Sequence, residues 1–218
     1  MESSVEPLRL ALQTTAKQLG VNVSEVQTDA LLNYLALLLR WNLHYNLTAV
    51  RETSLMLTQH IADCLGVIGP LRRQVDRSGS RVLDVGSGGG LPGIVIAILD
   101  PAIDVMCIDS VGKKTAFVQQ VAVELGLRNI GMRHARVQDV AMGKFDVVTS
   151  RAFASLQNFT QVSFRHLSES GSWMAMKGRL PAKELADLPV GIDTFHVEHL
   201  VIPGLDAERC LVWMRPRR

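Results

Sequence analysis

Five glycines occur within eight residues, from Gly86 to Gly93, directly after a short apolar segment that contains Asp84. The stretch reads Val82-Leu83-Asp84-Val85-Gly86-Ser87-Gly88-Gly89-Gly90-Leu91-Pro92-Gly93. Glycine tolerates positive φ and lets the backbone approach a ligand closely. Between a strand and a helix, such a turn leaves amide N–H groups free to bind an anionic or flat ligand. The stretch therefore predicts a site for a nucleoside-containing cofactor.

The spacing of the glycines is compatible with two cofactors, a dinucleotide and S-adenosylmethionine. Gly88, Gly90 and Gly93 match the G-x-G-x-x-G pattern of dinucleotide sites. That turn begins directly at a strand end, however, where this chain has Gly86. A carboxylate at Asp84 would repel a pyrophosphate but suits a sulfonium or ammonium group, and Pro92 is expected in the first helical turn, where its missing N–H costs nothing. The order Asp84-x-Gly86-x-Gly88-x-Gly90 is typical of S-adenosylmethionine-dependent methyltransferases, while a nicotinamide-dependent oxidoreductase remains the alternative.

Further candidate contacts follow the next expected strands. Asp109 ends the second strand, 25 positions after Asp84, where a carboxylate can take both ribose hydroxyls. Val137 and Gln138 follow the third strand, so an apolar side chain and an amide are expected at the adenine ring. Arg151 follows the fourth strand, over the crevice in which open α/β sheets bind ligands. The expected cofactor-binding residues are Asp84, Gly86, Gly88, Leu91, Asp109, Val137, Gln138 and Arg151.

Short apolar runs alternate with helical patterns after residue 80, and these elements must position the site. The expected strands are Arg81–Val85, Asp104–Asp109, Ile130–His134, Phe145–Ser150, Ser172–Lys177, Phe195–Val201 and Arg209–Arg215. The expected helices are Leu91–Leu99, Lys113–Leu125, Ser155–His166 and Ala182–Leu188. This alternation predicts an α/β fold with a doubly wound, mostly parallel Rossmann-like sheet. Only Pro203-Gly204 breaks the chain between the last two strands, so an antiparallel hairpin is expected at one edge.

Helical patterns dominate the chain before residue 70. Ser24 and Gln27 form a capping-box pattern that opens a helix expected to run to about Leu39. A second apolar stripe, from Leu57 to Ile68, indicates another helix, which Gly69-Pro70 is expected to end.

Composition limits the class of protein. A chain of 218 residues that is 47% hydrophobic and 20% charged can bury a core without disulfides. We expect a helical extension over residues 1–70 and a methyltransferase domain over residues 71–218. Cys64, Cys107 and Cys210 lie in apolar stretches without metal-ligand spacing, so we expect no metal and a reducing cytosol. No apolar run reaches the ~18 residues of a membrane span, and no signal-peptide pattern opens the chain.

With these residues in hand, the chain resembles the ribosomal RNA small subunit methyltransferase G family, also called glucose-inhibited division protein B. The likeness covers most of the chain and rests on Arg40-Trp41-Asn42, Asn46-Leu47-Thr48-Ala49-Val50, His60-Ile61-Ala62-Asp63-Cys64-Leu65, the glycine stretch, Asp109-Ser110-Val111-Gly112-Lys113-Lys114, Ser150-Arg151-Ala152-Phe153-Ala154-Ser155-Leu156, Met176-Lys177-Gly178 and Val201-Ile202-Pro203-Gly204-Leu205-Asp206-Ala207-Glu208-Arg209. Many methyltransferases share the glycine turn. The Asn-Leu-Thr, Leu-Pro-Gly, Ser-Arg-Ala and Lys-Gly elements together are far more specific.

The resemblance implies a bacterial cytosolic enzyme that uses S-adenosylmethionine to methylate N7 of one guanosine in the decoding-region loop of 16S rRNA. It implies cofactor contacts at Gly86, Leu91, Val137, Gln138 and Arg151, with Asp109 on the ribose. The family usually has Glu at the position of Gln138, so we expect altered cofactor affinity but retained function. The expected partner is 16S rRNA in the small subunit or an assembly intermediate, with no membrane contact, and the expected state is a monomer.

The chemistry of guanine N7 sets what the protein must supply. N7 carries a lone pair and no proton, so its methylation needs no general base, and positioning can supply ~7–11 kcal/mol. We expect Arg151 and Lys177 to be the catalytic residues, with Arg151 between cofactor and substrate and Lys177 beside the target's backbone together with Arg179. The helical extension is expected to add a wall from Arg40, Asn42, Asn46 and Arg51, although Asn46 and Trp41 also have purely structural interpretations. His60 fits a hydrogen-bonded core histidine better than a ligand. A methyltransferase acting on a small molecule or a protein remains a second alternative.

Overall fold

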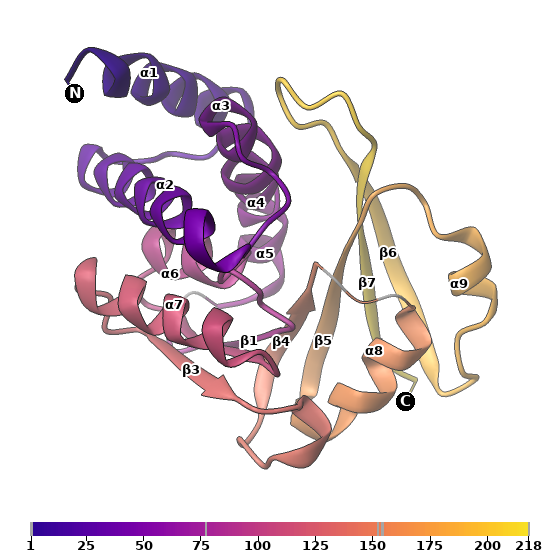
Figure 1. Cartoon of the computed structure of the whole chain (residues 1–218). Helices are drawn as coiled ribbons and strands as arrows, with labels where there is room; N and C mark the ends of the chain where they lie inside the picture. The colour runs from indigo at the N-terminus through magenta and orange to yellow at the C-terminus, as the bar shows by residue number, and fades with distance from the viewer. Residues whose placement is uncertain (1, 77, 152, 154, 218) are drawn as a thin grey trace.

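A seven-stranded sheet with helices on both faces makes up the fold (Figure 1). The computed structural model describes residues 2–76, 78–151, 153 and 155–217. Its strands are β1 (Arg81–Val85), β2 (Asp104–Asp109), β3 (Ile130–His134), β4 (Phe145–Ser150), β5 (Leu167–Lys177), β6 (Ile192–Leu200) and β7 (Arg209–Pro216). They lie in the order β3-β2-β1-β4-β5-β7-β6, and the first five pair in parallel. Because β7 runs antiparallel to both β5 and β6, the predicted antiparallel edge is confirmed.

The helices divide between the two faces of the sheet. The first group comprises α1 (Glu2–Gln18), α2 (Glu25–Tyr45), α3 (Thr53–Met56), the π-helix η1 (Leu57–Ala62), α4 (Asp63–Leu65), α5 (Ile68–Gln74), α6 (Gly93–Leu99) and α7 (Gly112–Glu124). The second comprises the 3-10 turn η2 (Val137–Asp139), α8 (Leu156–Ser163), the 3-10 turn η3 (Phe164–His166) and α9 (Ala182–Ala186). Residues of α1, α2, α6 and α7 share one apolar cluster, and residues of α8 belong to a second cluster.

Alternate strand residues enter opposite clusters, as the period of two in a strand requires. On β1, Val82 joins the α2 and α6 side, whereas Leu83 joins the α8 side. On β7, Trp213 and Val212 divide in the same way, and all four side chains are completely buried. Burial on both faces explains why the strands read as continuous apolar runs.

The first four strands coincide with their predicted ranges, but β5 begins earlier, at Leu167. Leu167 pairs with Phe145 of β4, and the register shifts before the next pair. The polar residues between Leu167 and Ser172 hide this first part of the strand in the sequence pattern.

Helix α2 confirms one prediction and corrects another. Ser24 caps it, and Gln27 completes the capping box from the third helical position. The predicted end at Leu39 is wrong, because the helix continues to Tyr45 and ends at Asn46 in the left-handed conformation (φ 48°). Trp41 packs against Phe117 of α7, with ring centroids 5.4 Å apart, and this contact favours the extra turns.

Two predicted positions of proline are also wrong. Gly69-Pro70 does not end a helix, because both residues lie in the first turn of α5. The first N–H groups of a helix have no partner within it, so proline is tolerated there. Pro92 precedes α6, which begins at Gly93 rather than at Leu91.

None of the described helices combines the length and apolar composition of a bilayer span.

Candidate functional site

The carboxyl ends of β1, β2 and β4 lie next to one another, because these strands are parallel neighbours. The glycine loop leaves the end of β1 with Gly86 at φ 68°, a conformation that other residues adopt at a cost. At its far end Gly93 lies so close to β2 that an added Cβ would be 2.5 Å from the Cys107 sulfur. The loop is thus fixed at both ends by positions that require glycine.

The first cavity at this edge, the Asp109 cavity, has a volume of about 300 Å³. Its lining includes four of the predicted residues, namely Gly86, Asp109, Val137 and Gln138. It is also lined by residues that the sequence patterns did not predict, among them Ile108, Val111, Lys114, Arg136 and Phe153. The cavity therefore combines apolar side chains with one carboxylate and the basic side chains of Lys114 and Arg136, a lining that suits a flat base and a dihydroxylated sugar.

Asp109 holds the loop and faces the cavity at once. Its Oδ2 accepts a hydrogen bond from the Gly88 N–H (2.9 Å), and its Oδ1 accepts one from the Val111 N–H (2.8 Å). Each carboxylate oxygen has more than one lone pair, so the group can accept further bonds from ribose hydroxyls. Predicted Gly88 therefore contributes by anchoring Asp109 as well as by lining the neighbouring cavity.

The backbone of η2 places Val137 and Gln138. The buried His166 ring donates through Nε2 to the Val137 carbonyl (3.0 Å), and Arg165 donates to the Gln138 carbonyl (3.0 Å). Val137 is buried while Gln138 is exposed at the cavity rim. Two side chains of η3, the turn after α8, therefore hold the backbone of η2, which carries the predicted adenine contacts.

A second cavity, the Arg151 cavity, has a volume of about 190 Å³ and shares Gly86 and Lys114 with the first. It is lined by Leu38, Leu47, Thr48, His60, Gly86, Ser87, Gly88, Gly89, Leu91, Lys114 and Arg151. A third, the Lys177 cavity, has about 330 Å³ and is lined by Gln59, His60, Asp63, Arg151, Met176, Lys177, Gly178 and Arg209. Because His60 and Arg151 line both, the three cavities adjoin one another in a row, with these two residues in the wall, or junction, between the second and the third.

The guanidinium of Arg151 is held by the helical segment before β1. Its Nη1 donates to the Gln59 carbonyl (3.3 Å) and lies 3.5 Å from the Asp63 carboxylate. Asp63 is buried and also binds Arg209, at 2.8 Å. One carboxylate therefore balances part of the charge of two arginines at the junction.

His60 sits at the same junction, in the π-helix η1. Arg151 Nη1 lies 3.4 Å from Nδ1, and Thr48 Oγ1 lies 2.7 Å from Nε2. Because arginine only donates, Nδ1 accepts and the ring proton is on Nε2, directed at Thr48. Burial and the charge of Arg151 both lower the pKa of His60, so the ring is neutral. The prediction of a hydrogen-bonded, buried histidine is confirmed, but its place between two cavities has no signal in the sequence.

Asp84 lies behind the glycine loop and not on a cavity wall. It is completely buried, and its Oδ2 accepts a hydrogen bond from the Gly93 N–H (2.9 Å). Its Oδ1 has no hydrogen-bond partner among the described residues. Burial raises the pKa of this carboxyl to about 7, against the lowering effects of the Gly93 N–H and Arg151. The charges of Arg151 and Asp109, which line the cavities, also act on this pKa, Arg151 lowering it and Asp109 raising it.

Lys177 lines the Lys177 cavity, but its amine is already paired with a carboxylate. Its Nζ donates to the Glu184 carboxylate (2.8 Å) and to the Phe153 carbonyl (3.1 Å). Arg179, expected beside it, is exposed two residues further on. The pair with Glu184 reduces the positive charge that Lys177 presents to the Lys177 cavity.

The wall expected from the N-terminal helices is only partly present. Asn42 is buried, donates to the Val50 carbonyl (3.0 Å) and accepts from the Thr48 N–H (2.9 Å). Its amide is therefore used within the protein, where it closes the loop that carries Thr48 into the Arg151 cavity. Asn46 caps α2, and Arg51 and Arg40 are exposed.

All three cysteines are buried, as predicted for core residues.

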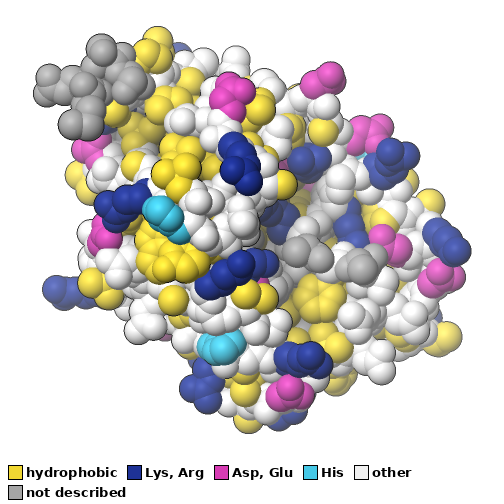
Figure 2. Space-filling view, in the orientation of Figure 1, with side chains coloured by type: hydrophobic (Ala, Val, Ile, Leu, Met, Phe, Trp, Pro, Cys, Tyr) yellow, Lys and Arg dark blue, Asp and Glu magenta, His cyan; other side chains and the backbone are white. Residues whose placement is uncertain are grey.

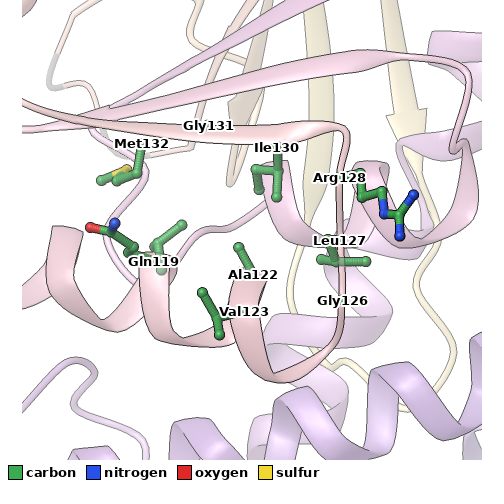
Figure 3. A pocket seen from close by; sticks show the side chains of 10 residues that line it. Gln119, Ala122, Val123, Gly126, Leu127, Arg128, Ile130, Gly131 and Met132 are labelled. Carbon is green, nitrogen blue, oxygen red and sulfur yellow. The ribbon is translucent and has the colours of Figure 1, made fainter.

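A separate apolar cavity of about 410 Å³ lies between α7 and β3 (Figure 3). Val123 and Ala122 face Ile130 and Met132 across it. It opens toward the amino end of β3, whereas ligands of open α/β sheets bind at the carboxyl ends of the strands. None of the predicted site residues lines it, whereas all of them but Asp84 line the three adjoining cavities, which are therefore the candidate site.

The fold and the Asp109 cavity define an S-adenosylmethionine-dependent methyltransferase of the Rossmann-like class. A solved structure of this class, the methyltransferase of Geobacter sulfurreducens in complex with S-adenosyl-L-homocysteine, superposes with a TM-score of 0.53. It is 15% identical and covers 71% of this chain and 90% of its own, so the likeness shows the fold.

Residues 27–212 match the family described as rRNA small subunit methyltransferase G. The chain is 53% identical over 207 residues to ribosomal RNA small subunit methyltransferase G of Methylibium petroleiphilum, covering 95% of this chain and 94% of the relative. It is 51% identical to that of Paracidovorax citrulli, covering 100% and 94%. The chain belongs to the ribosomal RNA small subunit methyltransferase G family, as its sequence indicated. This membership does not favour a nicotinamide-dependent oxidoreductase or a small-molecule methyltransferase.

Proposed function

We propose that the protein transfers the methyl group of S-adenosylmethionine to N7 of a guanosine in the decoding-region loop of 16S rRNA. The observation that carries this proposal is the row of three adjoining cavities, with Arg151 in the lining of both the second and the third. The family membership supplies the substrate class.

The Asp109 and Arg151 cavities fit the cofactor. Asp109 would accept the ribose hydroxyls, Val137 and Phe153 would contact the adenine, and Gln138 would offer it an amide. Gly86 and Leu91 line the path toward the methionine part. When bound, S-adenosylmethionine supplies an electrophilic methyl group on a cationic sulfur. The buried carboxyl of Asp84 favours positive charge on the other side of the loop.

The substrate side needs positioning and no proton transfer, because guanine N7 has a free lone pair. We propose that Arg151 orients the base at the junction and that Lys177 binds the backbone of the target nucleotide. The product base is cationic, so uncompensated positive charge against it would oppose the reaction. Asp63 beside Arg151 and Glu184 beside Lys177 reduce that charge.

The proposal also covers the two parts of the chain and the setting in which the enzyme acts. We infer that residues 1–70 act as a helical extension on a methyltransferase domain at 71–218, with α5 crossing this boundary. The shared apolar cluster, which includes Leu31 of α2 and Ile94 of α6, supports a fixed packing of the two parts. We further infer that the enzyme acts in the cytosol, as a monomer, on small subunits or assembly intermediates.

The direct test is mass-spectrometric mapping of methylated nucleotides after incubation with S-adenosylmethionine and small subunits from a strain that lacks the enzyme. We expect one N7-methylguanosine in the decoding-region loop. No incorporation into 16S rRNA, or methylation at another base, would refute the proposal.

Arg151→Ala tests the residue that carries the proposal. We expect the rate of methyl transfer to fall at least tenfold, while the melting temperature falls little more than in a matched control. Arg72→Ala is that control, because Arg72 is similarly exposed (22% against 26% of the side chain) and also pairs with a buried carboxylate, Asp100. Equal losses of rate in the two variants would mean that Arg151 only stabilises the fold.

A further inference from the structure

Three aromatic side chains form a row at the carboxyl end of α2. Trp41 packs on the buried ring of Phe117, and Tyr45 lies on Trp41 with ring centroids 5.0 Å apart. His44 follows at 6.4 Å from Tyr45. Tyr45 is 44% exposed, so the row leads from the core to a partly exposed ring.

Two exposed basic side chains belong to segments that adjoin this row. Arg51 is exposed and donates to the Asn46 amide oxygen at the end of α2 (3.4 Å). Lys113, also exposed, lies one turn before Phe117 on the same side of α7. Two acidic side chains of these segments are engaged, Glu124 with Arg40 (3.3 Å) and Glu52 with Ser54. Figure 2 shows hydrophobic and histidine side chains flanked by Lys and Arg on the face over α2 and α7.

The row also lies next to the candidate site. Leu47 and Thr48, two and three residues after Tyr45, line the Arg151 cavity. Lys114, the neighbour of Lys113, lines the same cavity from α7. A nucleotide that flanks a base bound at the junction of the Arg151 and Lys177 cavities would pass this loop on the way to the ring of Tyr45.

We propose that Tyr45, backed by Trp41, is a stacking platform for an unpaired base that flanks the methylated guanosine, and that Arg51 and Lys113 bind its phosphates. This inference rests on the proposed function and adds a second contact for the RNA outside the cavities. Every base has a π-face, and stacking on an aromatic side chain contributes ~1–3 kcal/mol per base. Phosphate contacts from Lys and Arg add affinity without sequence preference. The combination of a ring and cations favours RNA over an apolar protein partner.

Tyr45→Ala and Tyr45→Phe separate the ring from the hydroxyl. With unmodified small subunits as substrate, we expect Tyr45→Ala to raise KM about tenfold, which corresponds to ~1.4 kcal/mol, with S-adenosylmethionine affinity unchanged. Tyr45→Phe should behave as the wild type. Phe164→Ala is the matched control, because Phe164 is also exposed (53%) and rests on a tryptophan, Trp173, at 5.9 Å. It should leave KM unchanged.

A KM unchanged in Tyr45→Ala, or raised equally in Tyr45→Phe or Phe164→Ala, would overturn the platform. Binding of a fluorescent fragment of unmodified 16S rRNA separates this failure from failure of the proposed function. If the wild type binds the fragment tenfold more tightly than Tyr45→Ala but methylates no RNA, the platform stands and the proposed reaction falls. If methylation proceeds and both bind equally, only the platform falls.

Discussion

Replacing Asp84 by Asn removes an ionisable group from the interior while keeping an oxygen that can accept the Gly93 N–H bond. Burial raises the pKa of Asp84 from its ordinary value of 3.8 to about 7. In the unfolded chain the carboxyl ionises near the ordinary value, so between these limits the folded protein binds more protons. Stability therefore falls as pH rises through this range and stays reduced above it.

The magnitude follows from the two pKa values. A difference of about 3 units at 1.36 kcal/mol each gives a cost of about 4 kcal/mol above pH 7. About half of this, roughly 2 kcal/mol, develops between about pH 5.5 and about pH 8.5. Asparagine does not titrate, so the stability of Asp84→Asn relative to the wild type should increase by that amount over the same interval.

Urea unfolding of both proteins at the two pH values measures this change. Asp104→Asn, at an exposed position at the start of β2, controls for the loss of one negative charge. The pH dependence is the quantity of interest, since the exchange of oxygen for nitrogen at the unpartnered Oδ1 adds a constant. A difference that is the same at both pH values would refute the assignment of burial as the dominant effect on Asp84.

Two further predictions concern the same loop and junction. Burial and the charge of Arg151 lower the pKa of His60 below its ordinary value of 6.5, so the native state loses stability as pH falls below that value. His60→Gln should remove this loss, which melting temperatures measured over the acidic pH range would show. If the melting temperature of the variant fell with pH as steeply as that of the wild type, the neutral ring would be contradicted. Gly93→Ala would place a methyl group 2.5 Å from the Cys107 sulfur and 3.0 Å from Asp84 Oδ2, and should destabilise the fold by about 1–3 kcal/mol. Gly191→Ala, whose methyl group meets nothing within 4 Å, should be neutral in the same urea experiment and is the control.

Local patterns were sufficient for most of the sheet and for the outline of the cofactor site. The short apolar runs predicted β1 to β4 because each strand is buried on both faces, and the capping box predicted the start of α2 because Ser24 and Gln27 bond within one turn. Asp109 could be placed because carboxyl ends of parallel strands meet at one edge. These features depend on residues close in sequence or on a general rule of topology.

Tertiary contacts determined what those patterns left open. The end of α2 depends on Trp41 meeting Phe117, which is distant in sequence. The junction depends on Arg151 meeting His60 and Gln59, across about ninety residues.

The sequence by itself therefore determined the order of the elements, the glycine turn and the family, because these depend on residue types and spacing along the chain. Only the folded chain decided that Asp84 is buried behind the loop, that Asn42 holds the Thr48 loop, and that His60 separates two cavities. Burial and hydrogen-bond partners arise from packing between distant segments, and packing sets the charge state and the role of a polar side chain.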